Sequence, residues 1–129
     1  MRTALLAFAL GMASSALIAQ GGTFIVPDAV SADPKHYLVA YENDVIRVLR
    51  VRYGPGEKSV MHAHPANCAI FVTDQQFNFT VPDGTGGEES IKAGQFGCGD
   101  ANVHLPENTG TNTAEMIIVE LKNRQTFKE

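Results

Sequence analysis

The sequence predicts an all-β protein, an antiparallel sandwich or barrel formed by one domain. Short runs rich in apolar and β-branched residues follow one another and are separated by turns rich in glycine, proline, asparagine and aspartate. After the N-terminal stretch, no segment keeps a helical apolar period over about 11 residues. The chain has 129 residues, 44% of them hydrophobic and 19% charged, which suits one globular domain without an internal repeat or a linker.

The N-terminal stretch differs from the rest of the chain. Met1-Arg2 gives a short positive start, and a run rich in small apolar residues follows it. This run is shorter than the roughly 20 strongly apolar residues that cross a bilayer. We therefore expect a secretory signal peptide over residues 1–20, with an uncleaved anchor as the alternative. The mature domain, residues 21–129, is then periplasmic or secreted and not bound to the membrane.

The remaining elements are expected where apolar runs lie between turns. Residues 21–36 contain glycines, prolines and turn formers, and predict an irregular lead-in with at most a short strand at 24–26. The strands predicted after it are, in chain order, 37–41, 45–53, 58–64, 69–73, 77–81, 89–92, 95–98, 102–105 and 115–122. A polar, glycine-rich turn over 82–87 separates two of them.

Two of the predicted strands carry apolar residues on both faces. They lie within 69–72 and 116–121, whereas a strand with one wet face alternates between apolar and polar residues. Such a strand is covered by a second layer or pairs with a second subunit. We expect a homodimer, because a domain of this size gains core by association. The alternative is that the lead-in folds across this face.

The charge and the aromatic content narrow the choice of partners. The formal net charge is -4, no basic stripe is present, and tryptophan is absent. These features do not favour nucleic acid as a partner. We expect a small-molecule ligand or substrate instead.

Three histidines are placed where they can share one ion. His62 and His64 lie two residues apart in a predicted strand, so their side chains point to the same face. His104 lies in a later strand and is the candidate third ligand. Neutral imidazole suits divalent iron, zinc, manganese, nickel and copper, so the sequence predicts a divalent metal site without identifying the ion. His36, in the lead-in, is expected at the surface.

The surroundings of these histidines resemble the two motifs of the cupin superfamily. The first motif runs from a glycine through five residues to His-x-His and, after three or four more residues, a glutamate. The second places a glycine about ten residues before the third metal histidine and an asparagine four residues after it. The matching positions are Gly56, His62, His64, Gly94, His104 and Asn108. Where the family has a proline and a glycine ahead of this histidine, the chain has Gly99 and Ala101.

This resemblance covers about residues 40–122 and implies a single jelly-roll-like barrel with a divalent metal in a pocket at one mouth. Cupins include dioxygenases, isomerases, sugar-binding proteins and storage proteins, so the fold leaves the reaction open. The leading expectation is a metal-binding cupin with a dioxygenase- or isomerase-like reaction on a small oxygenated molecule. The alternatives are non-catalytic binding of a small molecule or metal ion, and a structural domain with a relic site. No catalytic residue is assigned.

The family's glutamate is missing from this sequence. The two positions where it would stand hold Cys68 and Ala69. The site therefore has three histidines alone, has Cys68 as a fourth ligand or pocket residue, or holds no functional metal. Strand parity places Cys68 on the histidine face unless Pro65 introduces a bulge. Cys68 is otherwise a buried small hydrophobe or the partner of Cys98 in a disulfide.

Polar residues near His104 are candidates to support the ligands. Asp100 and Asn102 share strand parity with His104, so either is placed to accept a hydrogen bond from an imidazole N–H. Asn108 is placed to donate to a ligand or to orient the turn after His104. All three are also explained as ordinary turn residues. Arg47 is expected in a salt bridge, with an anion in the pocket as the alternative partner.

Overall fold

The structure is a computed structural model that describes residues 25–127. The signal peptide expected over residues 1–20 lies outside the described residues and stays a prediction. In chain order the elements are α1 (Ala29–Ala32), β1 (Tyr37–Glu42), β2 (Ile46–Tyr53), β3 (His62–His64), β4 (Asn67–Phe71), β5 (Gln75–Thr80), β6 (Gly86–Ile91), β7 (Phe96–Gly99), β8 (Asn102–Asn108) and β9 (Ala114–Leu121). In the part of the chain that the structure describes, no helix is long and apolar enough to cross a membrane.

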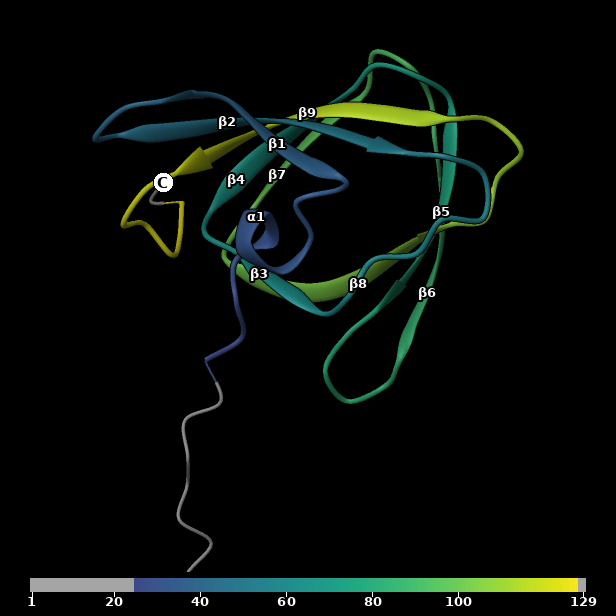
Figure 1. Cartoon of the computed structure of the whole chain (residues 1–129), viewed down its shortest axis with the longest axis horizontal. Coiled ribbons are helices and arrows are strands. Elements are labelled where there is room, and N and C mark those ends of the chain that lie inside the picture. The colour runs from purple at the N-terminus through teal and green to yellow at the C-terminus, as the bar shows by residue number, and fades with distance from the viewer. Residues whose placement is uncertain (1–24, 128–129) are drawn as a thin grey trace, which may run out of the picture.

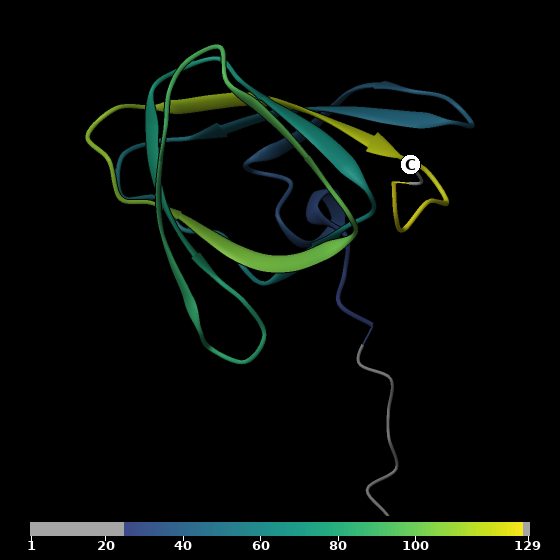
Figure 2. The same ribbon diagram turned by 180° about the vertical axis from the view of Figure 1, so that it is seen from behind.

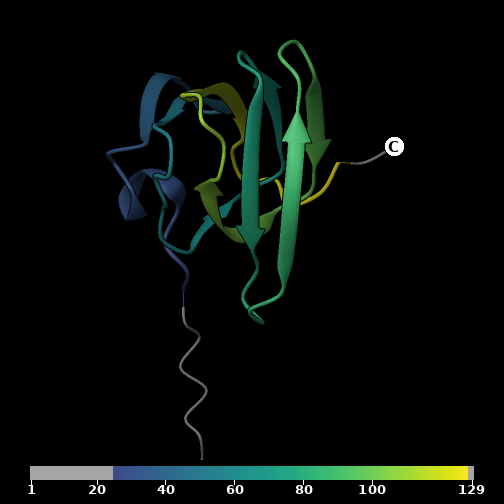
Figure 3. The same cartoon turned by 90° about the vertical axis from the view of Figure 1, so that its right-hand side faces the viewer.

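The strands form two sheets that face each other (Figures 1 and 2). One sheet has five strands in the order β1-β2-β9-β4-β7, and the other has four in the order β3-β8-β5-β6. All neighbouring strands within the sheets pair antiparallel. Figure 3 views the molecule from the side of β5 and β6. The predicted all-β, antiparallel, jelly-roll-like architecture is confirmed.

Strand limits differ from the prediction on either side of the histidines. β3 spans only His62–His64, while Lys58 forms an isolated bridge to Glu107. β8 runs on to Asn108, beyond the predicted end at residue 105. Pro106 lies within this extension and has no N–H to donate. Its carbonyl instead accepts a hydrogen bond from the Ser59 N–H at 2.9 Å, so the strand continues through it.

The lead-in contains one turn of helix, α1, that the sequence did not predict. The side chain of Asp28 caps this turn by accepting hydrogen bonds from the Val30 N–H at 3.2 Å and the Ser31 hydroxyl at 2.6 Å. α1 packs against β1 and β3, and Ala29 is fully buried in the core. Of the strand considered at 24–26, Ile25 and Val26 are not in a strand, and residue 24 lies outside the described residues.

His36 is buried, with 4% of its surface exposed, and the prediction of a surface position was wrong. Its ring stacks on Tyr53, with centroids 4.1 Å apart. Nδ1 lies 2.6 Å from an Asp33 oxygen and Nε2 lies 3.1 Å from a Glu57 oxygen. The ring is buried because both of its polar atoms find partners in the fold.

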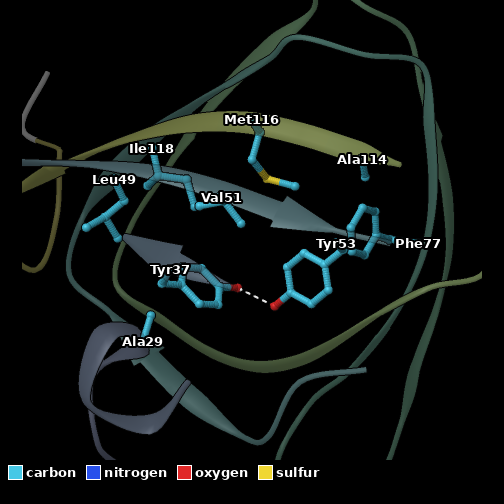
Figure 4. Packing of buried hydrophobic residues seen from close by; sticks show 9 residues of the cluster. All are labelled: Ala29, Tyr37, Leu49, Val51, Tyr53, Phe77, Ala114, Met116 and Ile118. Carbon is cyan, nitrogen blue, oxygen red and sulfur yellow. Dashed lines mark hydrogen bonds between the residues drawn. The ribbon is translucent and has the colours of Figure 1, made fainter. Parts of the chain in front are cut away.

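The core lies between the sheets, mainly against the inner face of the five-stranded sheet (Figure 4). Its buried members are Ala29, Tyr37, Leu49, Val51, Tyr53, Phe77, Ala114, Met116 and Ile118. Tyr37 and Tyr53 point into the interior, and their hydroxyl groups are 2.9 Å apart. Both hydroxyls are thus held inside the barrel, on the side where β3 faces them.

The outer face of the five-stranded sheet stays partly exposed. Ile70 and Val72 are 40% and 51% exposed, while the outward side chains of β9 are partly buried. A second copy of the chain on this face would bury these side chains, so the expected homodimer stays a prediction.

Cys68 and Cys98 lie directly opposite each other on β4 and β7 and form a disulfide. The pairing joins cysteines 30 residues apart in sequence, and such a link stabilises a fold chiefly by restricting the unfolded chain. Replacing both by serine is therefore expected to lower the free energy of unfolding by about 3 kcal/mol. Urea unfolding followed by circular dichroism measures this, with reduced wild-type protein as the matching sample. An unchanged unfolding midpoint would contradict the cross-link.

Candidate metal centre

The three predicted histidines come together on two paired strands of the four-stranded sheet. His62 and His64 lie on β3, and His104 lies directly opposite His62 on β8. Their ring centroids are 4.9 to 5.2 Å apart. One ring nitrogen from each lies within 4.8 Å of the others, so the group can hold a single metal ion. The alternation of side chains along a strand predicted that His62 and His64 lie together. The antiparallel register of β3 and β8 brings His104 beside them.

The orientation of two of these rings leaves a nitrogen atom free for a metal. His62 Nδ1 lies 2.8 Å from the Val60 carbonyl oxygen, and His64 Nδ1 lies 2.7 Å from a Glu120 carboxylate oxygen. Both partners accept hydrogen bonds, so each Nδ1 carries the hydrogen and each Nε2 keeps its lone pair. The two Nε2 atoms are buried and have no partner among the described residues. The residues therefore fit a bound metal ion.

His62 and His104 favour the neutral state that a metal ligand needs. Burial, together with the nearby His64, lowers the pKa of His62 to about 4. Burial, then His64 and His62, lowers the pKa of His104 to about 3. At neutral pH both rings are uncharged and offer lone pairs rather than protons.

The metal-free protein is expected to lose stability as the pH falls from about 6.5 toward 4. In this window the unfolded chain binds protons at these two histidines, whereas the folded protein, with pKa values of about 4 and about 3, does not. The free energy of unfolding therefore falls with the pH, by up to about 1.4 kcal/mol per pH unit for each histidine. Urea unfolding in a chelator at several pH values measures this slope. A flat profile in the wild type, or an equal slope in His104→Ala, would contradict the assignment.

The residues predicted from the sequence to hydrogen-bond the ligand histidines do not do so in the structure. Asp100 is exposed and its carboxylate accepts the Phe127 N–H at 2.8 Å. Asn102 is exposed and donates to the Asp100 carbonyl at 3.1 Å. Among the described residues, neither hydrogen-bonds to a histidine of the cluster. The prediction of second-layer roles for both residues was wrong, because they lie at the turn where β8 begins.

Asn108 shapes the turn after β8, as one of the two readings of the sequence had it. Its side chain is fully buried. The Nδ2 atom donates toward the carbonyls of Tyr53, Gly54 and Asn112 at 2.9 to 3.1 Å. The Oδ1 atom accepts the Gly110 N–H at 3.0 Å. Asn108 thus ties β2 to the β8–β9 connection and does not reach a metal ligand.

Glu120 is the supporting residue that sequence reasoning missed. It lies in β9, where Ala114, Met116, Ile118 and Glu120 alternate as buried residues. Its carboxylate contacts His64 and, at 2.6 Å, Arg47 on β2. The sequence could have pointed to Glu120, because it places a carboxylate at an inward position of an apolar strand. A buried charge without a partner is costly there, so such a residue is expected to have one. The salt bridge expected for Arg47 is present.

The fourth-ligand alternative for Cys68 is wrong in this structure. A metal ligand must be a thiolate, and the sulfur of Cys68 is bonded to Cys98. Cys68 also lies opposite Val119 on β9, so it faces away from the side of the sheet that carries Ile118 and Glu120, and the pocket position considered for it was wrong. The ligand set that remains consists of three imidazoles.

A cavity of about 500 Å³ adjoins the cluster. His64 and His104 line it together with aromatic and aliphatic side chains, among them Tyr37, Phe77 and Ile118. Of the described residues that line it, Glu89 is the one with a carboxylate, and none is a lysine or an arginine. The cavity is therefore suited to a small molecule with a largely apolar body.

Comparisons with known proteins agree on the fold. No family model matches the sequence, and no curated protein matches it. A solved cupin domain from Bordetella pertussis Tohama I is 18% identical, with a TM-score of 0.62 over 67% of this chain and 91% of that one. A protein with a double-stranded β-helix domain from Klebsiella pneumoniae, also 18% identical, reaches a TM-score of 0.55 over 73% and 87% of the two chains. An RmlC-like cupin from Methanocaldococcus jannaschii, again 18% identical, reaches 0.53 over 69% and 83%.

The chain has the cupin fold. The resemblance that the two histidine motifs predicted is thereby confirmed at the level of the fold, and the cluster occupies the strands on which those motifs lie.

Proposed function

We propose that this protein binds one divalent transition-metal ion through His62, His64 and His104 and uses it to act on a small oxygenated molecule. The reaction we propose is dioxygenase-like, with an isomerase-like reaction second. One observation carries the proposal: two buried Nε2 atoms converge and have no partner within residues 25–127, while the Nδ1 atoms of the same rings are held by acceptors.

The donor set defines the class of metal. Three neutral imidazoles suit iron, zinc, manganese, nickel or copper, and they leave the full charge of a divalent ion uncompensated. Bound there, such an ion would polarise an oxygen-bearing substrate and, if it were iron, would support chemistry with O₂. Because the family's glutamate is absent, the site keeps more positive charge. This charge favours an electron-rich or enolate-forming substrate.

The cavity supports a substrate with an apolar body and at least one oxygen. Phe79 lies against His104, with ring centroids 5.3 Å apart, and Tyr37 lies against His62 at 4.8 Å. Tyr53 donates its hydroxyl hydrogen to the Tyr37 oxygen, which leaves the Tyr37 hydrogen for an acceptor on a bound molecule. Burial raises the pKa of Tyr37 well above its ordinary value, so this hydroxyl stays a donor at neutral pH.

The second candidate is non-catalytic binding of a small molecule or of the ion itself. It is favoured by the lining of the cavity, which is built mostly of hydrocarbon and phenol groups. Such groups hold a ligand, but they are poor proton-transfer partners near neutral pH.

Metal analysis and oxygen uptake test the proposal together. Purified protein, or protein reconstituted with Fe²⁺, is expected to hold about one ion per chain and to consume O₂ with a diketone, a thiol or a phenol. His104→Ala should lose both properties. If the protein binds metal without turnover, and a small ligand raises its melting temperature, the non-catalytic binding function is favoured over the enzymatic one. Failure to retain any metal, even after reconstitution, would overturn the proposed metal-dependent function.

We also propose that the mature protein works in the periplasm or outside the cell. The Cys68–Cys98 disulfide supports an oxidising compartment, and the apolar N-terminal run supports export. N-terminal sequencing of the protein from a periplasmic or secreted fraction is expected to find a chain that starts near residue 21. An intact Met1 in a cytosolic fraction would contradict this.

A further inference from the structure

We propose that Glu120 is a positioning residue: held in place by Arg47, it fixes the tautomer of His64 and turns the Nε2 lone pair toward the metal. The inference rests on the proposed function, since it treats His64 as a ligand. It assigns a role to a chain of charged side chains that begins at the partly exposed Asp28 in the lead-in and ends at the buried candidate metal centre.

The contacts form an unbroken chain across the molecule. One carboxylate oxygen of Glu120 accepts from His64 Nδ1 at 2.7 Å, and the other accepts from Arg47 Nε at 2.6 Å. Arg47 Nη2 lies 3.0 Å from the carboxylate of Asp28. The side chains of Glu120 and His64 are 1% and 2% exposed. Both oxygens of Glu120 are thus engaged, and the carboxylate is held where it can only accept from His64.

The fold places these residues by register rather than by proximity in sequence. Arg47 and Glu120 are direct cross-strand partners on β2 and β9, whereas His64 lies on β3 in the facing sheet. The hydrogen bond between Glu120 and His64 therefore joins the two sheets. The lead-in adds a second tie beside the ligands, because the Ala63 N–H donates to the Pro27 carbonyl at 2.9 Å. Ala63 lies between His62 and His64, so the ligand strand is held along both of its edges, by β8 on one and by the lead-in on the other.

A carboxylate is better suited to this task than a neutral acceptor. The guanidinium of Arg47 lies 2.6 Å from one oxygen of Glu120 and compensates the negative charge of the buried carboxylate. An ionised carboxylate accepts only, so His64 Nδ1 must carry the hydrogen. An anionic partner also makes the imidazole a stronger donor to a metal. His62, by contrast, contacts the Val60 backbone carbonyl at 2.8 Å and the Ser59 hydroxyl only at 3.4 Å, so no carboxylate fixes its tautomer among the described residues.

The same two strands provide a matched control. Arg52 and Glu115 are also direct partners on β2 and β9, with Nε and Oε1 3.3 Å apart. Their side chains are 72% and 42% exposed. Since the two pairs are five positions apart on each strand, they lie on opposite faces of the sheet. A change at Glu115 thus repeats the chemistry of a change at Glu120 without touching the histidines.

The test compares Glu120→Gln with Glu115→Gln. Arg47 can only donate, so it takes the amide oxygen of the new glutamine and leaves the NH₂ group facing His64 Nδ1. We expect His64 to shift to the Nε2–H tautomer, which ¹⁵N NMR of the metal-free protein reads directly. Zn²⁺ affinity, measured by competition with a chelator dye, should fall about 10- to 100-fold. Glu115→Gln should change neither quantity.

Other results of these measurements would overturn either the role of Glu120 or the proposed function. Wild-type His64 found in the Nε2–H tautomer would overturn the inference without the need for any variant. Zn²⁺ affinity that Glu120→Gln leaves unchanged would also overturn it, while the proposed function would stand. A wild-type protein that binds no Zn²⁺ would contradict the proposed function, and the tautomer measurement would still decide the role of Glu120.

Discussion

Replacing His62 by alanine is expected to weaken binding of Zn²⁺ or Fe²⁺ by more than about 100-fold. Removal of a hydrogen-bond partner of a metal ligand already costs about 10- to 100-fold in affinity, and removal of the ligand itself costs more. His62 is fully buried, and its Nε2 atom has no partner among the described residues. The change therefore removes a metal-binding nitrogen, and it also leaves the Val60 carbonyl without the hydrogen bond from His62 Nδ1. Competition titration with a chelator dye measures the loss.

His36→Gln is the control for this experiment. His36 is also a buried histidine, but its nitrogens contact Asp33 and Glu57, and it does not belong to the three-histidine cluster. We expect it to keep wild-type metal affinity even if its folding is weaker. Equal losses in both variants, or no loss in His62→Ala, would contradict the assignment of the ligands.

Replacing Asn108 by alanine is expected to lower the free energy of unfolding by about 4 kcal/mol. The side chain is fully buried and reaches the carbonyls of Tyr53, Gly54 and Asn112. Alanine would leave the buried Tyr53 carbonyl and the partly buried carbonyls of Gly54 and Asn112 without their donor, and would add a small void. Urea unfolding of the metal-free protein measures the effect.

Asn102→Ala is the matched change on the same strand. Asn102 is exposed and donates to a backbone carbonyl two residues before it, so its removal should change stability by no more than about 0.5 kcal/mol. Similar losses in the two variants would mean that the contacts of Asn108 do not stabilise the fold as described.

Local patterns in the sequence were sufficient to predict the strands and to place two of the three metal ligands. Side chains alternate along a strand whatever it pairs with, so His62 and His64 could be placed on one face from their spacing alone. The third ligand, His104, needed the motif resemblance, because its position depends on the pairing of β3 with β8.

Three of the features that the sequence missed or left open depend on partners distant in sequence. Glu120 was read as part of an apolar run, since its partners His64 and Arg47 lie 56 and 73 residues away. His36 was read as a surface residue because Glu57, one of its two partners, lies 21 residues further along the chain. The disulfide was one of several alternatives, because only the register of β4 and β7 brings Cys68 opposite Cys98.

X-ray absorption spectroscopy of the zinc-loaded protein tests the central claim most directly. The account predicts one ion per chain, with scattering from three imidazole rings whose nitrogens lie at about 2.0–2.1 Å and from no sulfur. Cys68 is held in its disulfide, and the three histidines are the cluster that the fold brings together. A sulfur shell at about 2.3 Å, or a spectrum with fewer than three imidazoles, would contradict a three-histidine centre.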